Sequence, residues 1–195
     1  MSTIQVADDK ITRIQFSAKG FKHTFFLVYK SAYGFSKGID DSKDWDIMAV
    51  LGSVACFSIE LYLKFLAVIA SFNTSSHSGY HFRGHFLDEL YTGLKGIDSN
   101  YTDDLETLFS HSKYNKGQSL FDFLKEIREQ FLDWRYVYDK GNLTVNLNTL
   151  SDVLNILEKY SSEKYIPISK HIRLGSSVEQ SMFIDNFDDV KEDIV

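Results

Sequence analysis

The sequence predicts an all-α protein, an up-and-down bundle of five or six helices with room for a short strand at either end. One observation is an almost entirely apolar stretch over residues 45–72, and the other is a set of amphipathic segments with three- and four-residue spacing. A chain of 195 residues, 44% of them apolar, is expected to fold as one domain. We expect its core at about residues 20–161, with an N-terminal arm over 1–18 and a C-terminal extension with an acidic tail over 162–195.

The central stretch, residues 45–72, predicts a helix surrounded by other helices. Its polar residues fall in one narrow seam when the stretch is placed on a helix: Asp46, Ser53, Glu60, Lys64 and Ser71. A membrane-spanning helix needs about 20 consecutive apolar residues, and Glu60 and Lys64 interrupt this one near its middle. We therefore expect a buried core helix, capped by Ser42 or Asp44, and no membrane partner.

The other elements follow from hydrophobic spacing and stop signals. Residues 1–18 show a weak alternation that would suit a short strand, and residues after Pro167 show another. Asp98 or Ser99 is expected to cap a helix through Leu105. The remaining predicted helices cover about residues 19–37, 84–94, 119–139 and 148–161.

The cysteine and histidine content bears on cofactors. Cys56 is the only cysteine, so disulfides and a thiolate metal site are excluded, and a reducing, cytoplasmic location is expected, in keeping with a polar N-terminus unlike a signal peptide. His77, His81 and His85 recur every four residues, but the glycines among them favour a loop, and no metal is expected. The chain has no glycine-rich phosphate loop, so no cofactor is expected.

Charge is distributed unevenly along the chain. Residues 10–39 carry six basic residues and no acid, whereas residues 179–195 carry six acids against Lys191. This division predicts either a polyanion-binding face or two ends that neutralise each other. On the first helix, lysines surround two aromatic rings, a pattern that suits single-stranded nucleic acid. The candidates are Lys19, Lys22, Phe26, Lys30, Tyr33 and Lys37.

Three segments together resemble a known family. Residues 58–64 (SIELYLK) contain a glutamate and a lysine four apart, residues 84–90 (GHFLDEL) open the next helix, and residues 131–138 (FLDWRYVY) lie late in the bundle. In this order they resemble HEPN domains (higher eukaryotes and prokaryotes nucleotide-binding), over roughly residues 45–160. The resemblance implies a helical bundle that dimerises, in a bacterial defence or toxin–antitoxin context, beside a partner such as a nucleotidyltransferase.

Many HEPN domains are metal-independent ribonucleases with an arginine followed, four to six residues later, by a histidine. Neither Arg128 nor Arg135 is followed by such a histidine here. The function expected from the resemblance is therefore a noncatalytic binding module for RNA, a nucleotide or a partner protein. One alternative is an endoribonuclease in which Arg135 acts with Tyr138, Asp139 or His85 in place of the missing histidine. The other is a structural dimerisation protein.

The proposed centre of the site is a polar group inside the apolar helix. Glu60 and Lys64 cannot be buried without partners except at a cost of several kcal/mol. We expect Arg135 to contact Glu60, so that Glu60, Lys64 and Arg135 form a polar centre. The same group can be read as an ion pair that fixes the register of the bundle.

Overall fold

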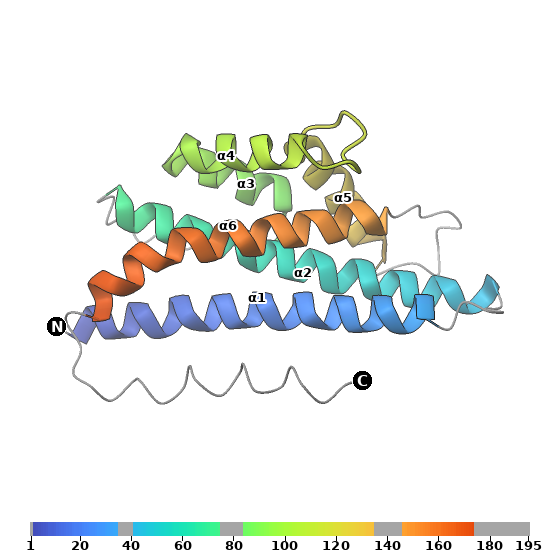
Figure 1. The fold of residues 1–195 in the computed structure, drawn as a ribbon, viewed down its shortest axis with the longest axis horizontal. Coiled ribbons are helices and arrows are strands. Elements are labelled where there is room, and N and C mark those ends of the chain that lie inside the picture. Colours follow the sequence, from blue (N-terminus) through green and yellow to red (C-terminus); the bar gives the residue numbers. More distant parts are fainter. Residues whose placement is uncertain (1, 35–40, 75–83, 135–145, 174–195) are drawn as a thin grey trace.

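The computed structural model describes residues 2–34, 41–74, 84–134 and 146–173, and within them the protein is an all-α helical bundle (Figure 1). Its elements are α1 (Ser2–Gly34), α2 (Asp41–Asn73), α3 (Leu87–Ile97), α4 (Ser99–Ser110), α5 (Leu120–Trp134) and α6 (Leu147–Arg173). The predicted fold class is confirmed.

Helix α2 is the centre of the bundle. It contacts α1, α3, α5 and α6, and Figure 1 shows it between long α1 on one side and the short helices α3 to α5 on the other. Its residues from Leu51 to Ala70 supply much of the core, including Ile59, Phe65 and Leu66, each with no exposed surface. Neighbouring helices thereby bury most of the apolar surface of α2 inside the bundle.

The same helix meets the length and composition of a membrane span. Among the described residues, Ile47–Asn73 has a mean hydropathy of 1.8, and 67% of its most apolar window is buried by the rest of the bundle. The remaining third of that window is not fully buried, and its apolar residues, such as Val54, Phe57, Leu61 and Val68, are half-buried.

The shorter helices follow the predicted stripes. The inward residues of α3 (Leu87, Leu90, Tyr91, Leu94) and of α6 (Leu150, Val153, Leu154, Leu157, Tyr160) are all buried. Asp98 caps α4, because its side chain accepts a hydrogen bond from the backbone N–H of Asn100 at 3.1 Å. The predicted buried stripe on α5 is confirmed for Leu120, Leu124 and Ile127.

The prediction of a short strand near either end of the chain is wrong. Helix α1 begins at Ser2, so residues 2–18 are helical and continuous with the first predicted helix, and α6 continues past Pro167 to Arg173. A lone strand would leave its N–H and C=O groups without a ladder partner, whereas a helix satisfies them internally. Ala18 of α1 is fully buried against the bundle, and Ser58 of α2 donates to its carbonyl oxygen at 2.8 Å.

Candidate functional site at the junction of α2 and α3

The predicted polar residues of α2 form a compact cluster where α2 meets the start of α3. Glu60 is only 5% exposed, and its Oε1 atom accepts from Lys64 Nζ at 2.6 Å and lies 2.9 Å from His85 Nδ1. Lys64 reaches Glu60 because residues four apart share a helix face. We call Glu60, Lys64 and His85 the junction cluster.

His85 is the accessible member of this cluster. It belongs to the short segment 84–86 that leads into α3, after Gly84, whose φ of +135° favours glycine. Its side chain is 70% exposed although Nδ1 contacts the buried carboxylate. Among the described residues, no partner is found for the other ring nitrogen, Nε2, so that atom can meet solvent or a ligand.

A second ion pair involves Asp88, which follows His85 of the junction cluster by three residues in the sequence. Arg128 of α5 donates from Nη1 to both carboxylate oxygens of Asp88, at 2.8 and 3.1 Å, and its guanidinium lies 4.0 Å from the ring centroid of Phe86. Asp88 is buried, so the arginine supplies the charge that makes its burial tolerable. Sequence reasoning missed this pair because Asp88 and Arg128 are 40 residues apart and no local spacing links them.

Several predicted site residues lie outside the described residues: Arg135, Tyr138, Asp139, Lys37, His77 and His81. The side chain of Tyr33 also lies outside them. The expected contact between Glu60 and Arg135 therefore stays a prediction. Lys64 and His85 already bond the Glu60 carboxylate without it.

The basic side of α1 is only partly available to a ligand. Lys22 pairs with Glu158 of α6 and lies 5.5 Å from the ring centroid of Phe26, and that ring packs against the core with an edge-on contact to Phe25. Lys22 and Phe26 thus hold α1 to the bundle. Lys30 is exposed and Lys19 is half-buried, so these two candidates remain at the surface.

An apolar stripe along α2 was not foreseen. Seven residues separated by three or four positions line one side of the helix and are exposed or half-buried, and Lys64 is the one charged member. They are Val50, Val54, Phe57, Leu61, Lys64, Val68 and Phe72, which we call the α2 stripe. Val50 and Phe72, near its two ends, are 49% and 51% exposed.

The α2 stripe is bounded by α1 and by the junction cluster. Phe21 of α1 stacks on Phe57 at 5.7 Å between ring centroids, which extends the apolar surface onto α1. On the other side, Lys64 belongs to both the stripe and the junction cluster. The sequence could not reveal the stripe, because α2 is apolar on nearly all sides and no polar face marks which side stays uncovered.

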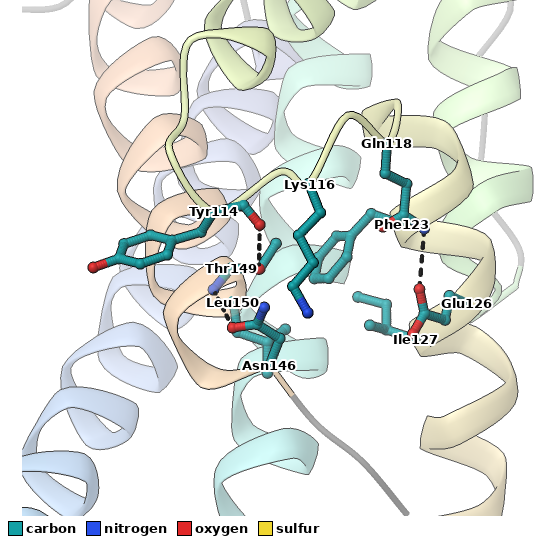
Figure 2. A pocket seen from close by; sticks show the side chains of 9 residues that line it. All are labelled: Tyr114, Lys116, Gln118, Phe123, Glu126, Ile127, Asn146, Thr149 and Leu150. Atoms are coloured by element: carbon teal, nitrogen blue, oxygen red, sulfur yellow. Dashed lines mark hydrogen bonds between the residues drawn. The ribbon is translucent and has the colours of Figure 1, made fainter.

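A shallow hollow of about 390 Å³, open solvent included, lies between the loop after α4, helix α5 and the beginning of α6 (Figure 2). Its polar groups already bond one another: Gln118 donates to Glu126 at 3.0 Å, and the Thr149 hydroxyl donates to the carbonyl oxygen of Tyr114 at 2.9 Å. Lys116, with a left-handed φ of 53°, extends its amine into the hollow. These polar groups stabilise the loop between α4 and α5.

Cys56 and Tyr62, two buried groups of α2, are poor nucleophiles. Burial, with a smaller contribution from the Glu60 charge, raises the pKa of the Cys56 thiol far above its ordinary value, so the thiolate that would react is not formed. Burial, and then Glu158, raises the pKa of Tyr62 in the same way. No group of three His, Cys, Asp or Glu side chains among the described residues is arranged to hold a metal ion.

No protein-family model, curated protein or solved structure matches this chain.

Proposed function

We propose that this protein is a noncatalytic binding module that acts as a homodimer through the α2 stripe, in the manner that the HEPN resemblance implies. The observation that carries the proposal is the α2 stripe itself, an apolar surface with three- and four-residue spacing over more than three heptads. Such spacing on a straight helix suits packing against another helix.

The physical support is the cost of leaving this surface in water. Burying apolar surface gains about 25 cal/mol per Å², and monomers rarely expose contiguous apolar patches larger than a few hundred Å². Val50, Phe72 and Phe21 are all exposed, with the remaining apolar members of the stripe half-buried between them. A partner that covers the whole length of the stripe would remove all of it from water at once.

The charge pattern favours a second copy in antiparallel orientation. If two α2 stripes cross at Leu61, Val54 packs opposite Val68 of the other copy, and Lys64 lies opposite the partner copy's Phe57 ring. A lysine over an aromatic ring is attractive, whereas a parallel pairing would set the two Lys64 side chains together. The two-fold arrangement uses the same surface on both copies, as most dimers do.

The junction cluster lies at the edge of this interface and is the proposed place for an RNA or nucleotide phosphate. Lys64 is shared by the stripe and the cluster, and the imidazole of His85 is exposed beside it. Because Glu60 already balances Lys64, a phosphate bound there would depend on cations from both copies.

Sedimentation velocity of purified protein tests the dimer. Leu61→Glu, at the centre of the stripe, should raise the dimer dissociation constant at least about a hundredfold, because it would bury an unpaired charge in the interface. Leu108→Glu changes an exposed leucine on α4 and should leave the dimer intact. A wild-type monomer at all concentrations, or an unchanged dimer in Leu61→Glu, would contradict the proposal.

A second candidate, a metal-independent endoribonuclease, is favoured by the contact between His85 Nδ1 and Glu60. A carboxylate that holds one imidazole nitrogen leaves the other nitrogen oriented for proton transfer. In this candidate His85 takes the role of the missing histidine.

RNA degradation without metal tests the second candidate. His85→Ala and Arg135→Ala should each abolish cleavage, while His23→Ala, which changes an exposed histidine on α1, should not. Cleavage that survives His85→Ala would exclude His85 as the acid or base, and no cleavage by wild-type protein would leave the binding module as the proposed function.

A further inference from the structure

The outward side of α1 is an exposed surface with apolar centre and basic border. Phe16 and Leu27 are 58% and 56% exposed, and helical spacing places Gly20 and Thr24 on the same side between them. Lys19, His23 and Lys30 follow one border at spacings of four and seven. We call these residues the α1 outer face, and it points away from the face that packs on α2.

The C-terminal residues have a complementary sequence. In residues 179–195, Phe183, Phe187, Val190 and Ile194 recur at spacings of four, three and four, the pattern of one helix face. Six acids against one lysine give the segment a charge of −5, and most of the acids fall on the opposite side of that helix. An acidic segment with an apolar stripe matches an apolar surface bordered by lysines.

Helix α6 runs back along α1, so residues 179–195 follow a helix that ends close to the beginning of α1. Tyr29 donates to Asn148 at 3.3 Å, Lys22 pairs with Glu158, and Thr12 lies 3.4 Å from the Tyr165 hydroxyl, so α6 runs antiparallel to α1. Its last residues lie at the end of the bundle where α1 begins (Figure 1).

Length allows the segment to reach the α1 outer face. Along α1, Phe16 lies about 21 Å and Lys30 about 42 Å from Ser2, and the 22 residues after Arg173 span about 33 Å when helical and about 70 Å when extended. Residues 175–177 (GSS) have the composition of a turn, which would let the chain reverse onto α1.

We propose that residues 179–195 dock on the α1 outer face of the same chain, with Phe183 and Phe187 against its apolar centre and the acids near Lys19 and Lys30. This contact is separate from the α2 stripe and does not depend on dimer formation. In this arrangement the acidic C-terminal segment covers the basic α1 outer face, and the opposite charges of the two ends attract each other.

Thiol labelling of the full chain tests the docking. Ser17→Cys places a thiol on the exposed side of α1 beside Phe16, and Thr107→Cys places one on the exposed side of α4. The native Cys56 is buried and stays unlabelled. The thiol at position 17 should react at least about tenfold more slowly than the thiol at 107.

Two independent changes should remove this protection. Phe183→Asp with Phe187→Asp, or Lys19→Glu with Lys30→Glu, should each bring the rate at position 17 close to that at position 107. Lys95→Glu with Lys125→Glu, on α3 and α5, should leave the protection in place. Circular dichroism confirms that each variant is folded.

Equal labelling rates at the two positions in the otherwise unchanged chain would overturn the proposal. So would protection that survives both sets of changes. Protection that disappears on dilution would show that the segment comes from another copy, and this result would also overturn docking within one chain.

Discussion

His85 and Glu60, 25 residues apart in the sequence, meet at 2.9 Å between Nδ1 and Oε1, so that an exposed imidazole contacts a buried carboxylate. Lys64 shares the same oxygen. This arrangement connects the charged pair in the apolar middle of α2 to the segment that leads into α3. Glu60 therefore contributes both to the stability of the bundle and to the chemistry that its surface offers.

Glu60→Gln should lower the free energy of unfolding by about 1–2 kcal/mol, because a buried amide cannot replace a carboxylate that two cationic or polar groups share. Urea denaturation measures the change. Glu89→Gln is the matched control, since the Glu89 side chain is 62% exposed and its variant should stay within about 0.5 kcal/mol of wild type. Equal stability of Glu60→Gln and wild type would show that the ion pair is not structural.

Arg128→Ala should destabilise the protein by about 2–3 kcal/mol, because it leaves the buried Asp88 carboxylate without its cation and removes the contact with Phe86. Arg128→Lys keeps the charge but should lose part of the stability, since an ammonium cannot stack in the same way. Thermal or urea unfolding of wild type and the two variants ranks their stabilities, with Arg128→Lys expected between wild type and Arg128→Ala. A lysine variant weaker than the alanine variant would contradict this reasoning.

Glu106 should act as the cap of α5 from a different helix. Its carboxylate accepts from the backbone N–H groups of Leu120 and Phe121, at 2.8 and 3.1 Å, and from the Tyr91 hydroxyl at 3.0 Å. Glu106→Ala should cost about 1–2 kcal/mol of unfolding free energy, and Glu106→Gln, which keeps one acceptor, should cost less. Equal losses in urea denaturation would show that the capping bonds do not contribute.

The contact between Asp104 and Tyr160 should make the stability of the folded protein depend on pH in the acidic range. The Tyr160 hydroxyl donates to Asp104 at 2.8 Å and, with Lys164, lowers the pKa of that carboxyl below its ordinary value. A lowered pKa in the folded state adds stability above the unfolded value of about 3.9, and this is lost as pH falls through the folded value.

Tyr160→Phe should therefore melt at a lower temperature than wild type at pH 7, and the difference should shrink below about pH 4. Melting temperatures at pH 7, 5 and 3 give the comparison, with Tyr165→Phe as the control for loss of a hydroxyl on the same helix. A difference that is constant across this range would contradict a contribution from the Asp104 charge.

Helix positions could largely be predicted from the sequence because their apolar spacing is regular. The inward residues of α3, α5 and α6 follow their stripes directly. The secondary structure near the two ends of the chain was harder to predict. Alternation at Ile14 and Phe16 suggested a strand, yet Ile14 packs on the core while Phe16 points outward on a continuous helix, so the alternation was a local coincidence.

The site was only partly predictable for a related reason. Glu60 and Lys64 stood out because charges are rare in an apolar helix, and the cost of burying them predicted that they would have partners. The contact with His85 and the pairing of Asp88 with Arg128 join distant segments, and local spacing contains no signal for such contacts. The α2 stripe was hidden because its residues are chemically the same as those of the buried side.

Disulfide cross-linking between two single-cysteine variants tests the central claim about the α2 stripe most directly. With Cys56 replaced by Ala in both, one chain carries Val54→Cys and the other Val68→Cys, and the two are mixed under mild oxidation. The antiparallel dimer predicts that the mixture forms a covalent dimer and that Val54→Cys alone does not. Rapid cross-linking of Val54→Cys to itself, or no cross-linking in the mixture, would contradict it.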